Sequence, residues 1–132
     1  MGTTATILVV DDEADTVGLL ELTLQTAGYQ VQTATGGKEA LRKIREETFD
    51  LVLLDIMMPD LSGYDVLQKL KSEAVQTPPV VFLTAKSRPE DRQTGRSLGA
   101  AGFLIKPTTR GDLLDTVTAV LSRSPKPNAP DR

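Results

Sequence analysis

The feature that most constrains the fold of this chain is a series of five short apolar runs that alternate with segments of helical periodicity. Four of these runs are nearly continuous and rich in β-branched or aromatic residues, which is typical of parallel strands covered on both faces. The remaining run, Tyr29–Thr33, alternates apolar and polar residues, as expected of an edge strand. The predicted strands are Thr6–Val10, Tyr29–Thr33, Leu51–Leu54, Val80–Leu83 and Gly102–Ile105.

The segments between the runs carry apolar residues at helical spacing. A stripe from Val17 to Ala27 predicts the first helix, and Gly28 is placed to end it. Thr35 and Ser62 are candidate N-caps of the second and third helices. The apolar stripes of the other helices are Ala40, Leu41 and Ile44; Val66, Leu67 and Leu70; and Leu113, Leu114, Val117, Val120 and Leu121. Because strand and helix alternate five times, we expect an α/β fold, a (βα)5 unit with a parallel sheet and helices on both faces.

The fourth helix, Pro89–Leu98, is the weakest of the predicted helices. Its one large apolar residue is Leu98, so little apolar area is available to dock it on the sheet. Gly95 in its interior costs about 1 kcal/mol relative to Ala, and we therefore expect Gly95→Ala to stabilise the helix. Arginines recur every four residues from Arg88 to Arg96. This stripe is either a solvated face or a basic surface that a partner contacts.

Composition excludes several classes of function. The length of 132 residues suits one domain, which we assign to residues 1–122, with residues 123–132 as a Pro-rich tail or linker. The net charge of −3, without clustered Lys and Arg, argues against direct nucleic-acid binding. The chain has no cysteine and no histidine, so thiolate or zinc-histidine sites are excluded. No apolar run approaches the roughly 20 residues of a membrane span, and no signal peptide is evident, so a cytoplasmic location is expected.

Polar residues stand at the ends of four of the predicted strands. Asp11 and Asp12 follow the first strand, Asp55 the third, Thr84 the fourth and Lys106 the fifth. In an open parallel sheet, ligands bind outside these carboxyl ends, so the five side chains should gather at one edge. Taken singly, the acidic pair can simply cap a helix, and the other three residues can be ordinary turn or surface residues. Together they have the residue types that one phosphoryl site needs.

The chemistry of such a cluster follows from its charges. Three close carboxylates repel one another unless a cation intervenes, and oxygen ligands of this kind suit Mg²⁺. Lys106 can bind a phosphoryl oxygen, and Thr84 can donate a hydrogen bond to another. A carboxylate can attack phosphorus and form an aspartyl-phosphate, with the cation and the lysine stabilising the charge in transfer.

The segments ILVVDDE, DLVLLDIMMPDLSG, VVFLTA and GAAGFLIKP resemble those of receiver domains of bacterial two-component response regulators, including the chemotaxis receivers. The resemblance extends from about Thr6 to Leu121. It implies a flavodoxin-like, doubly wound sheet of strand order 2-1-3-4-5 and a phosphorelay function. It also implies a cis peptide between Lys106 and Pro107. Thr108 stands where many family members have Phe, which argues against the common transcription-factor subfamily.

The resemblance also implies a role for each site residue. Asp55 is expected to be the phosphoacceptor, with Lys106 as the phosphoryl-binding lysine. Mg²⁺, for which Mn²⁺ can substitute, would be held by Asp12, Asp55, the backbone carbonyl of Met57, and Asp11 directly or through water. Thr84 and Phe103 would form the switch pair, which alters the surface of the fourth helix, fifth strand and fifth helix.

The expected partners are a histidine kinase or phosphotransfer protein, an effector domain or output protein, and a second copy after phosphorylation. Membranes and nucleic acids are not expected partners. The domain would be a phosphoacceptor with Mg²⁺-dependent self-phosphorylation and autodephosphorylation, not an enzyme. Two alternatives are a haloacid-dehalogenase-type phosphatase, which needs a second carboxylate where Met57 stands, and a degenerate receiver that only binds a partner. Whether the domain stands alone or belongs to a larger regulator or hybrid kinase stays open.

Overall fold

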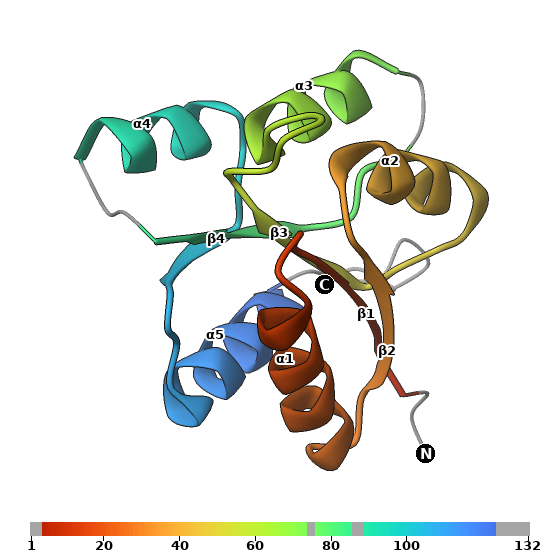
Figure 1. The fold of residues 1–132 in the computed structure, drawn as a ribbon, viewed down its shortest axis with the longest axis vertical. Helices are drawn as coiled ribbons and strands as arrows, with labels where there is room; N and C mark the ends of the chain where they lie inside the picture. Colours follow the sequence, from red (N-terminus) through yellow and green to blue (C-terminus); the bar gives the residue numbers. More distant parts are fainter. Residues whose placement is uncertain (1–3, 74–75, 86–88, 124–132) are drawn as a thin grey trace.

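The computed structural model describes residues 4–73, 76–85 and 89–123, which form a five-stranded parallel sheet with helices on both faces (Figure 1). The strand order β2-β1-β3-β4-β5 confirms the predicted doubly wound, flavodoxin-like topology. The strands are β1 (Thr6–Val10), β2 (Gln30–Ala34), β3 (Leu51–Asp55), β4 (Val80–Thr84) and β5 (Gly102–Ile105).

Each strand falls where its apolar run predicted it, with small shifts at the ends. Strand β2 begins one residue later than expected and lies at the edge of the sheet, as its alternating pattern indicated. Strands β3 and β4 each extend one residue further and include Asp55 and Thr84 as their last members. These two polar residues are therefore held by the sheet itself, and Asp55 pairs in register with Leu83.

The helices are α1 (Ala14–Thr26), α2 (Gly37–Glu46), α3 (Gly63–Ser72), α4 (Pro89–Ser97) and α5 (Arg110–Arg123). Helix α5 extends to Arg123, one residue past the expected domain boundary, and the rest of the predicted Pro-rich tail lies outside the described residues. The Lys106–Pro107 peptide bond is cis, as the resemblance implied. Among the described helices, none has the length and apolar character needed to cross a bilayer.

The helix ends confirm two of the three predicted terminal residues. Ser62 caps α3 through a capping box, accepting the Asp65 N–H while the Asp65 carboxylate accepts the Ser62 N–H. Gly28, with φ of +103°, follows the C-cap of α1 in the left-handed region that glycine adopts freely. The prediction for Thr35 is wrong: the N-cap of α2 is Gly36, and the Thr35 hydroxyl instead lies 3.2 Å from Glu39.

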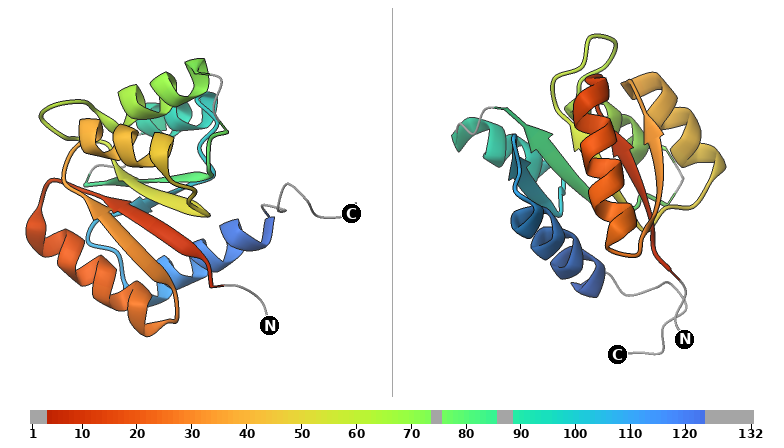
Figure 2. Two further views of the ribbon diagram at one scale, coloured as in Figure 1. Left: turned by 90° about the vertical axis from the view of Figure 1, so that its right-hand side faces the viewer. Right: turned by 60° about the horizontal axis from the view of Figure 1, so that its bottom comes forward.

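Helices lie on both sides of the sheet (Figure 2), and an apolar core fills the space between the sheet and the helices on each side. Helices α1 and α5 cover one face, over Ile7 and Leu53, and α2, α3 and α4 cover the other, over Leu8 and Phe82. The predicted apolar stripes face these cores, except that Ala27 is exposed at the end of α1. Because both faces are covered, the central strands are apolar throughout, and polar groups are confined to the strand ends.

Helix α4 differs from its prediction in how it docks. Leu98 packs on the core as expected, but Gly95 is also buried, and a Cβ at this position would lie 2.5 Å from Cζ of Phe103. The expectation that Gly95→Ala stabilises the helix rests on helix propensity alone, and the ring packed against the glycine opposes it. Arg92 and Arg96 are exposed, while Arg88 lies outside the described residues.

Candidate functional site

Three carboxylates meet at the carboxyl edge of the sheet. Asp11 and Asp12 follow β1, Asp55 ends β3, and one oxygen from each lies within 4.8 Å of the others. Asp11 and Asp55 are buried, whereas Asp12 is exposed. The pairing of β1 directly with β3 brings these residues together, although more than forty positions separate them in the chain.

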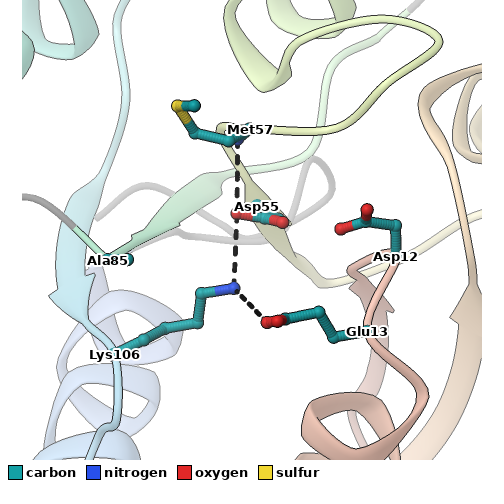
Figure 3. A pocket seen from close by; sticks show the side chains of 6 residues that line it. All are labelled: Asp12, Glu13, Asp55, Met57, Ala85 and Lys106. Atoms are coloured by element: carbon teal, nitrogen blue, oxygen red, sulfur yellow. Dashed lines mark hydrogen bonds and ion pairs between the residues drawn. The ribbon is translucent and has the colours of Figure 1, made fainter.

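Lys106 lies among these carboxylates at the end of β5. Its Nζ is 2.8 Å from Oδ2 of Asp11, 3.2 Å from Oε1 of Glu13 and 3.5 Å from Oδ1 of Asp55. Figure 3 shows the lysine side chain extending across the pocket toward Asp55 and Glu13. The Met57 N–H lies above the same carboxylate and donates to Oδ1 of Asp55 at 3.3 Å. Asp55 therefore has a cation on one side and a backbone donor on the other.

The electrostatic environment changes the proton affinity of Asp55. Burial, followed by the negative charge of Asp11, raises the pKa of Asp55 to about 7, against the lowering effects of Lys106 and of the Met57 N–H. Burial alone would lower the pKa of Lys106, but its hydrogen bond to Asp11 and the nearby carboxylate charges raise it above its ordinary value. The lysine is therefore charged at neutral pH, while Asp55 without a further cation is partly protonated. A divalent cation would relieve this repulsion, so the donor set fits a metal.

An open cavity of about 250 Å³ gives access to this cluster. Its lining residues are Asp12, Glu13, Asp55, Met57, Ala85 and Lys106. The side chain of Met57 is exposed at the rim. The cavity is large enough for a phosphoryl group, and carboxylates and a lysine surround it.

The two residues of the predicted switch pair lie away from the cavity lining. Thr84 is buried at the end of β4, where its carbonyl accepts the Lys106 N–H at 2.8 Å. Phe103 lies on β5 and packs with Phe82, on the face covered by α4. The Phe103 ring is half-buried and packs against the core. The sequence predicted this strand-end position for Thr84, but it did not predict the packing of Phe103.

Glu13 is a site residue that the sequence interpretation missed. It lines the cavity, bonds to Lys106, and donates its backbone N–H to Oδ1 of Asp11 at 2.9 Å. The signal was present, since Glu13 directly follows the acidic pair and begins the turn into α1. Its contact with a lysine 93 positions away could not be read from that local pattern.

The geometry has parallels in solved structures. The Vibrio cholerae chemotaxis response regulator CheY4 superimposes with a TM-score of 0.83 at 36% identity, over 89% of this chain and 99% of that one. A putative response regulator from Chloroflexus aurantiacus gives a TM-score of 0.85 at 32% identity, over 92% of this chain and 100% of the other. The family model described as "Response regulator receiver domain" matches residues 7–118. The chain belongs to the response regulator receiver domain family. It is a signalling domain of the two-component type and not a conventional enzyme, which removes the phosphatase alternative.

The curated relatives of this receiver domain are longer proteins. PhoP of Bacillus subtilis, an alkaline phosphatase synthesis transcriptional regulatory protein, is 42% identical over 118 residues, or 89% of this chain and 49% of that protein. The response regulator SaeR of Staphylococcus epidermidis is 39% identical over 122 residues, or 92% of this chain and 52% of that protein. The chain thus spans about half the length of the curated relatives it matches. The match covers only about half of each relative, so the expectation drawn from Thr108 about the subfamily stays a prediction.

Proposed function

We propose that this receiver domain accepts a phosphoryl group on Asp55 and uses it to change its α4–β5–α5 surface. The observation that carries the proposal is the position of Asp55, within 3.5 Å of Lys106 and grouped with Asp11 and Asp12 at the mouth of a cavity. Three carboxylates that can hold a divalent cation, together with one lysine, suit the transfer and retention of a phosphoryl group better than the turnover of an organic substrate.

In the proposed reaction, a carboxylate oxygen of Asp55 attacks phosphorus in a phosphohistidine or an acyl phosphate. A P–O bond forms to Asp55, and the bond to the donor imidazole nitrogen or acyl oxygen breaks with its electron pair leaving on the donor. Lys106 would donate to the phosphoryl oxygens, and its three N–H donors allow it to contact Asp11 at the same time. Water later cleaves the acyl phosphate and returns the carboxylate.

Mg²⁺ is the proposed cofactor, and it would supply positive charge to the transferred oxygens. Asp12, Asp55 and the carbonyl of Met57 would hold it, with Asp11 contributing directly or through water. The fit rests on the three carboxylate oxygens within 4.8 Å of one another and on the raised pKa of Asp55, which a bound cation would lower. Mn²⁺ has similar oxygen preferences and would substitute.

The phosphoacceptor role is tested with acetyl phosphate and intact-mass spectrometry. We expect one added phosphoryl group with Mg²⁺ or Mn²⁺ and none after chelation. Asp55→Asn should abolish the addition, and Asp115→Asn on the exposed face of α5 is a control of equal charge change. Phosphorylation of the Asp55→Asn variant at the rate of the native chain would refute the assignment.

The metal assignment is tested by isothermal titration with Mg²⁺. Both Asp11 oxygens already accept hydrogen bonds, from the Glu13 N–H and from Lys106, whereas Asp12 is exposed at the cavity. We therefore expect Asp12→Ala to weaken Mg²⁺ binding far more than Asp11→Ala. Equal losses in the two variants would contradict this ranking.

The remaining parts of the proposal concern the output. Thr84 would donate its hydroxyl to a phosphoryl oxygen, and Phe103 would respond on the neighbouring strand. Thr84→Ala should then retain phosphorylation in the mass assay and weaken the structural response.

The proposed partners are a histidine kinase or phosphotransfer protein and an effector domain, with dimerisation after phosphorylation as a further outcome. A cytoplasmic location is part of the same proposal.

A further inference from the structure

Helix α4 carries a buried glycine, Gly95, in its C-terminal half, and an aromatic ring occupies the place of the missing side chain. A Cβ added to Gly95 would lie 2.5 Å from Cζ and 2.6 Å from Cε1 of Phe103, and 3.1 Å from Cδ2 of Phe82. Real Cβ atoms do not approach carbon atoms at 2.5 Å, so any other residue at position 95 would have to displace the Phe103 ring or the helix.

The Phe103 ring belongs to a row of three rings beneath α4. Phe82 on β4 lies at its centre, with ring centroids 5.6 Å from Phe103 on one side and 5.2 Å from Tyr64 on the other. The Tyr64 hydroxyl donates to the carbonyl of Asp91 at 3.0 Å, in the first turn of α4. Helices α3 and α4 lie on the same side of the sheet (Figure 1). Helix α4, poor in apolar side chains of its own, is therefore docked by rings that belong to α3, β4 and β5.

We infer that Gly95 is the seat of the Phe103 ring and, through it, a positioning residue of the α4–β5 surface. The ring and the helix backbone are in direct contact, so the ring cannot change place without altering the support of α4. Because Phe103 follows the helix in the chain and pairs with Phe82 in the sheet, this contact links a strand of the phosphoryl site to the helix. The link to phosphorylation rests on the proposed function, whereas the seat itself does not.

The seat also shapes a surface feature. A hollow of about 290 Å³ lies between α4 and β5, lined by Arg92, Arg96, Ala100, Ala101, Gly102 and Phe103. The seated ring forms one wall of this hollow and two arginines form its basic rim. Loss of the seat would therefore change both the stability of α4 and the shape of the hollow.

Glycine-to-alanine exchanges at two helical positions give a matched test. Gly18 in α1 has no heavy atom within 4 Å of an added Cβ, so Gly18→Ala changes helix propensity alone. We expect Gly18→Ala to slow amide hydrogen exchange in α1 by about fivefold. Gly95→Ala should instead speed exchange of residues 90–98, because the displaced ring no longer supports the helix. Propensity alone predicts slower exchange at both positions.

A double-mutant cycle separates the ring from other causes. With Phe103→Ala already present, the space beside residue 95 is open, and adding Gly95→Ala should slow exchange in α4. The double variant also serves if Gly95→Ala alone fails to fold. Faster exchange from Gly95→Ala in both backgrounds, or slower exchange in both, would overturn the inference.

The coupling to phosphorylation is tested in the same variants with beryllofluoride. In the native chain we expect exchange of residues 90–98 to change upon beryllofluoride binding. Gly95→Ala should keep acetyl-phosphate labelling of Asp55 but lose that change. An unaltered beryllofluoride response in Gly95→Ala would refute the coupling. Absence of labelling in the native chain would instead refute the proposed function. The double-mutant cycle would still test whether the Phe103 ring packs against Gly95 and supports α4.

Discussion

The chemistry of this domain depends on a carboxylate that the fold makes reluctant to ionise. Asp55 is buried beside a second buried carboxylate, Asp11, and its pKa is raised to about 7. Lys106 offsets only part of this effect, because it lies closer to Asp11 than to Asp55. A protonated carboxyl is a poor nucleophile, so the proposed attack of Asp55 on phosphorus would require a further cation at the site.

The raised pKa predicts how stability depends on pH at the residue scale. The folded pKa lies above the ordinary value of 3.8, so the folded state binds this proton more tightly than the unfolded state. Stability from this group is present in full below pH 3.8 and is lost as pH rises toward about 7. Asp55→Asn removes the titration, and at pH 8 without metal it should raise the free energy of unfolding by on the order of 2 kcal/mol.

Urea unfolding followed by circular dichroism at pH 4 and pH 8, in the presence of a chelator, measures this difference. The gain in Asp55→Asn should be small at pH 4. Asp115→Asn on α5 should show no such gain at pH 8. A gain that is the same at both pH values would indicate a cause other than the titration of Asp55.

At the element scale, helix α2 is capped by a carboxylate from another loop. Gly36 at its N-cap offers no side chain, and the Asp60 carboxylate instead accepts the N–H groups of Gly37 and Lys38, each at 3.0 Å, and of Leu61 at 2.8 Å. The loop that follows β3 is thereby tied to the start of α2. A Cβ at Gly36 would lie 3.0 Å from the Asp60 carboxylate, so the glycine permits this approach.

Asp60→Ala should therefore destabilise the domain as loss of an N-cap does, by about 1 kcal/mol at pH 7. The hydrogen bonds from Lys38 and Gly37 lower the pKa of Asp60, so its contribution is present above the ordinary value of 3.8 and is lost as pH falls through the lower folded value. Denaturation curves should show the difference from the native chain shrinking below pH 3.8. The Asp60→Asn variant keeps an acceptor oxygen, so its free energy of unfolding should lie between those of the native chain and Asp60→Ala. If Asp60→Ala has the same free energy of unfolding as the native chain, the capping role is contradicted.

These elements also show what the sequence could and could not predict. Strands, their order of appearance and the strand-end polar residues were predictable, because apolar periodicity and the carboxyl edge of a parallel sheet depend on local pattern. The cap of α2 was assigned to Thr35 because Thr is a favourable capping residue, yet the oxygen comes from Asp60, 23 positions away from Gly37. Gly95 was read through helix propensity, whereas its environment is set by a ring on the neighbouring strand. At both positions the deciding contact comes from another element, which the local sequence pattern does not reveal.

At the scale of the whole molecule, the helices on one face of the sheet are held in different ways. Helices α2 and α3 are linked at both ends, by Asp60 and by Arg45, whose Nε lies 3.1 Å from Oε1 of Glu73. The contacts that dock helix α4 include the aromatic ring of Phe103, the packing of Leu98 on the core and the hydrogen bond from the Tyr64 hydroxyl to the Asp91 carbonyl. Because residues 89–98 include only one large apolar side chain, Leu98, we expect helix α4 to move relative to the sheet before α2 and α3 do.

The carboxylate cluster also predicts how the whole domain responds to a cation. Three carboxylate oxygens within 4.8 Å of one another repel in the folded state and separate in the unfolded chain, so a cation that binds only the folded site stabilises the fold. At one hundred times its dissociation constant, Mg²⁺ should add about 2.7 kcal/mol and raise Tm by on the order of 10 °C. The rise should be larger at pH 8 than at pH 5.5, because Asp55, with its pKa of about 7, holds a proton at the lower pH that competes with the metal. Differential scanning calorimetry with Mg²⁺ against NaCl of equal ionic strength measures the effect, and Asp12→Ala should abolish it. An equal rise with NaCl, or a larger rise at pH 5.5, would mean that screening of the net charge, and not occupation of this site, stabilises the domain.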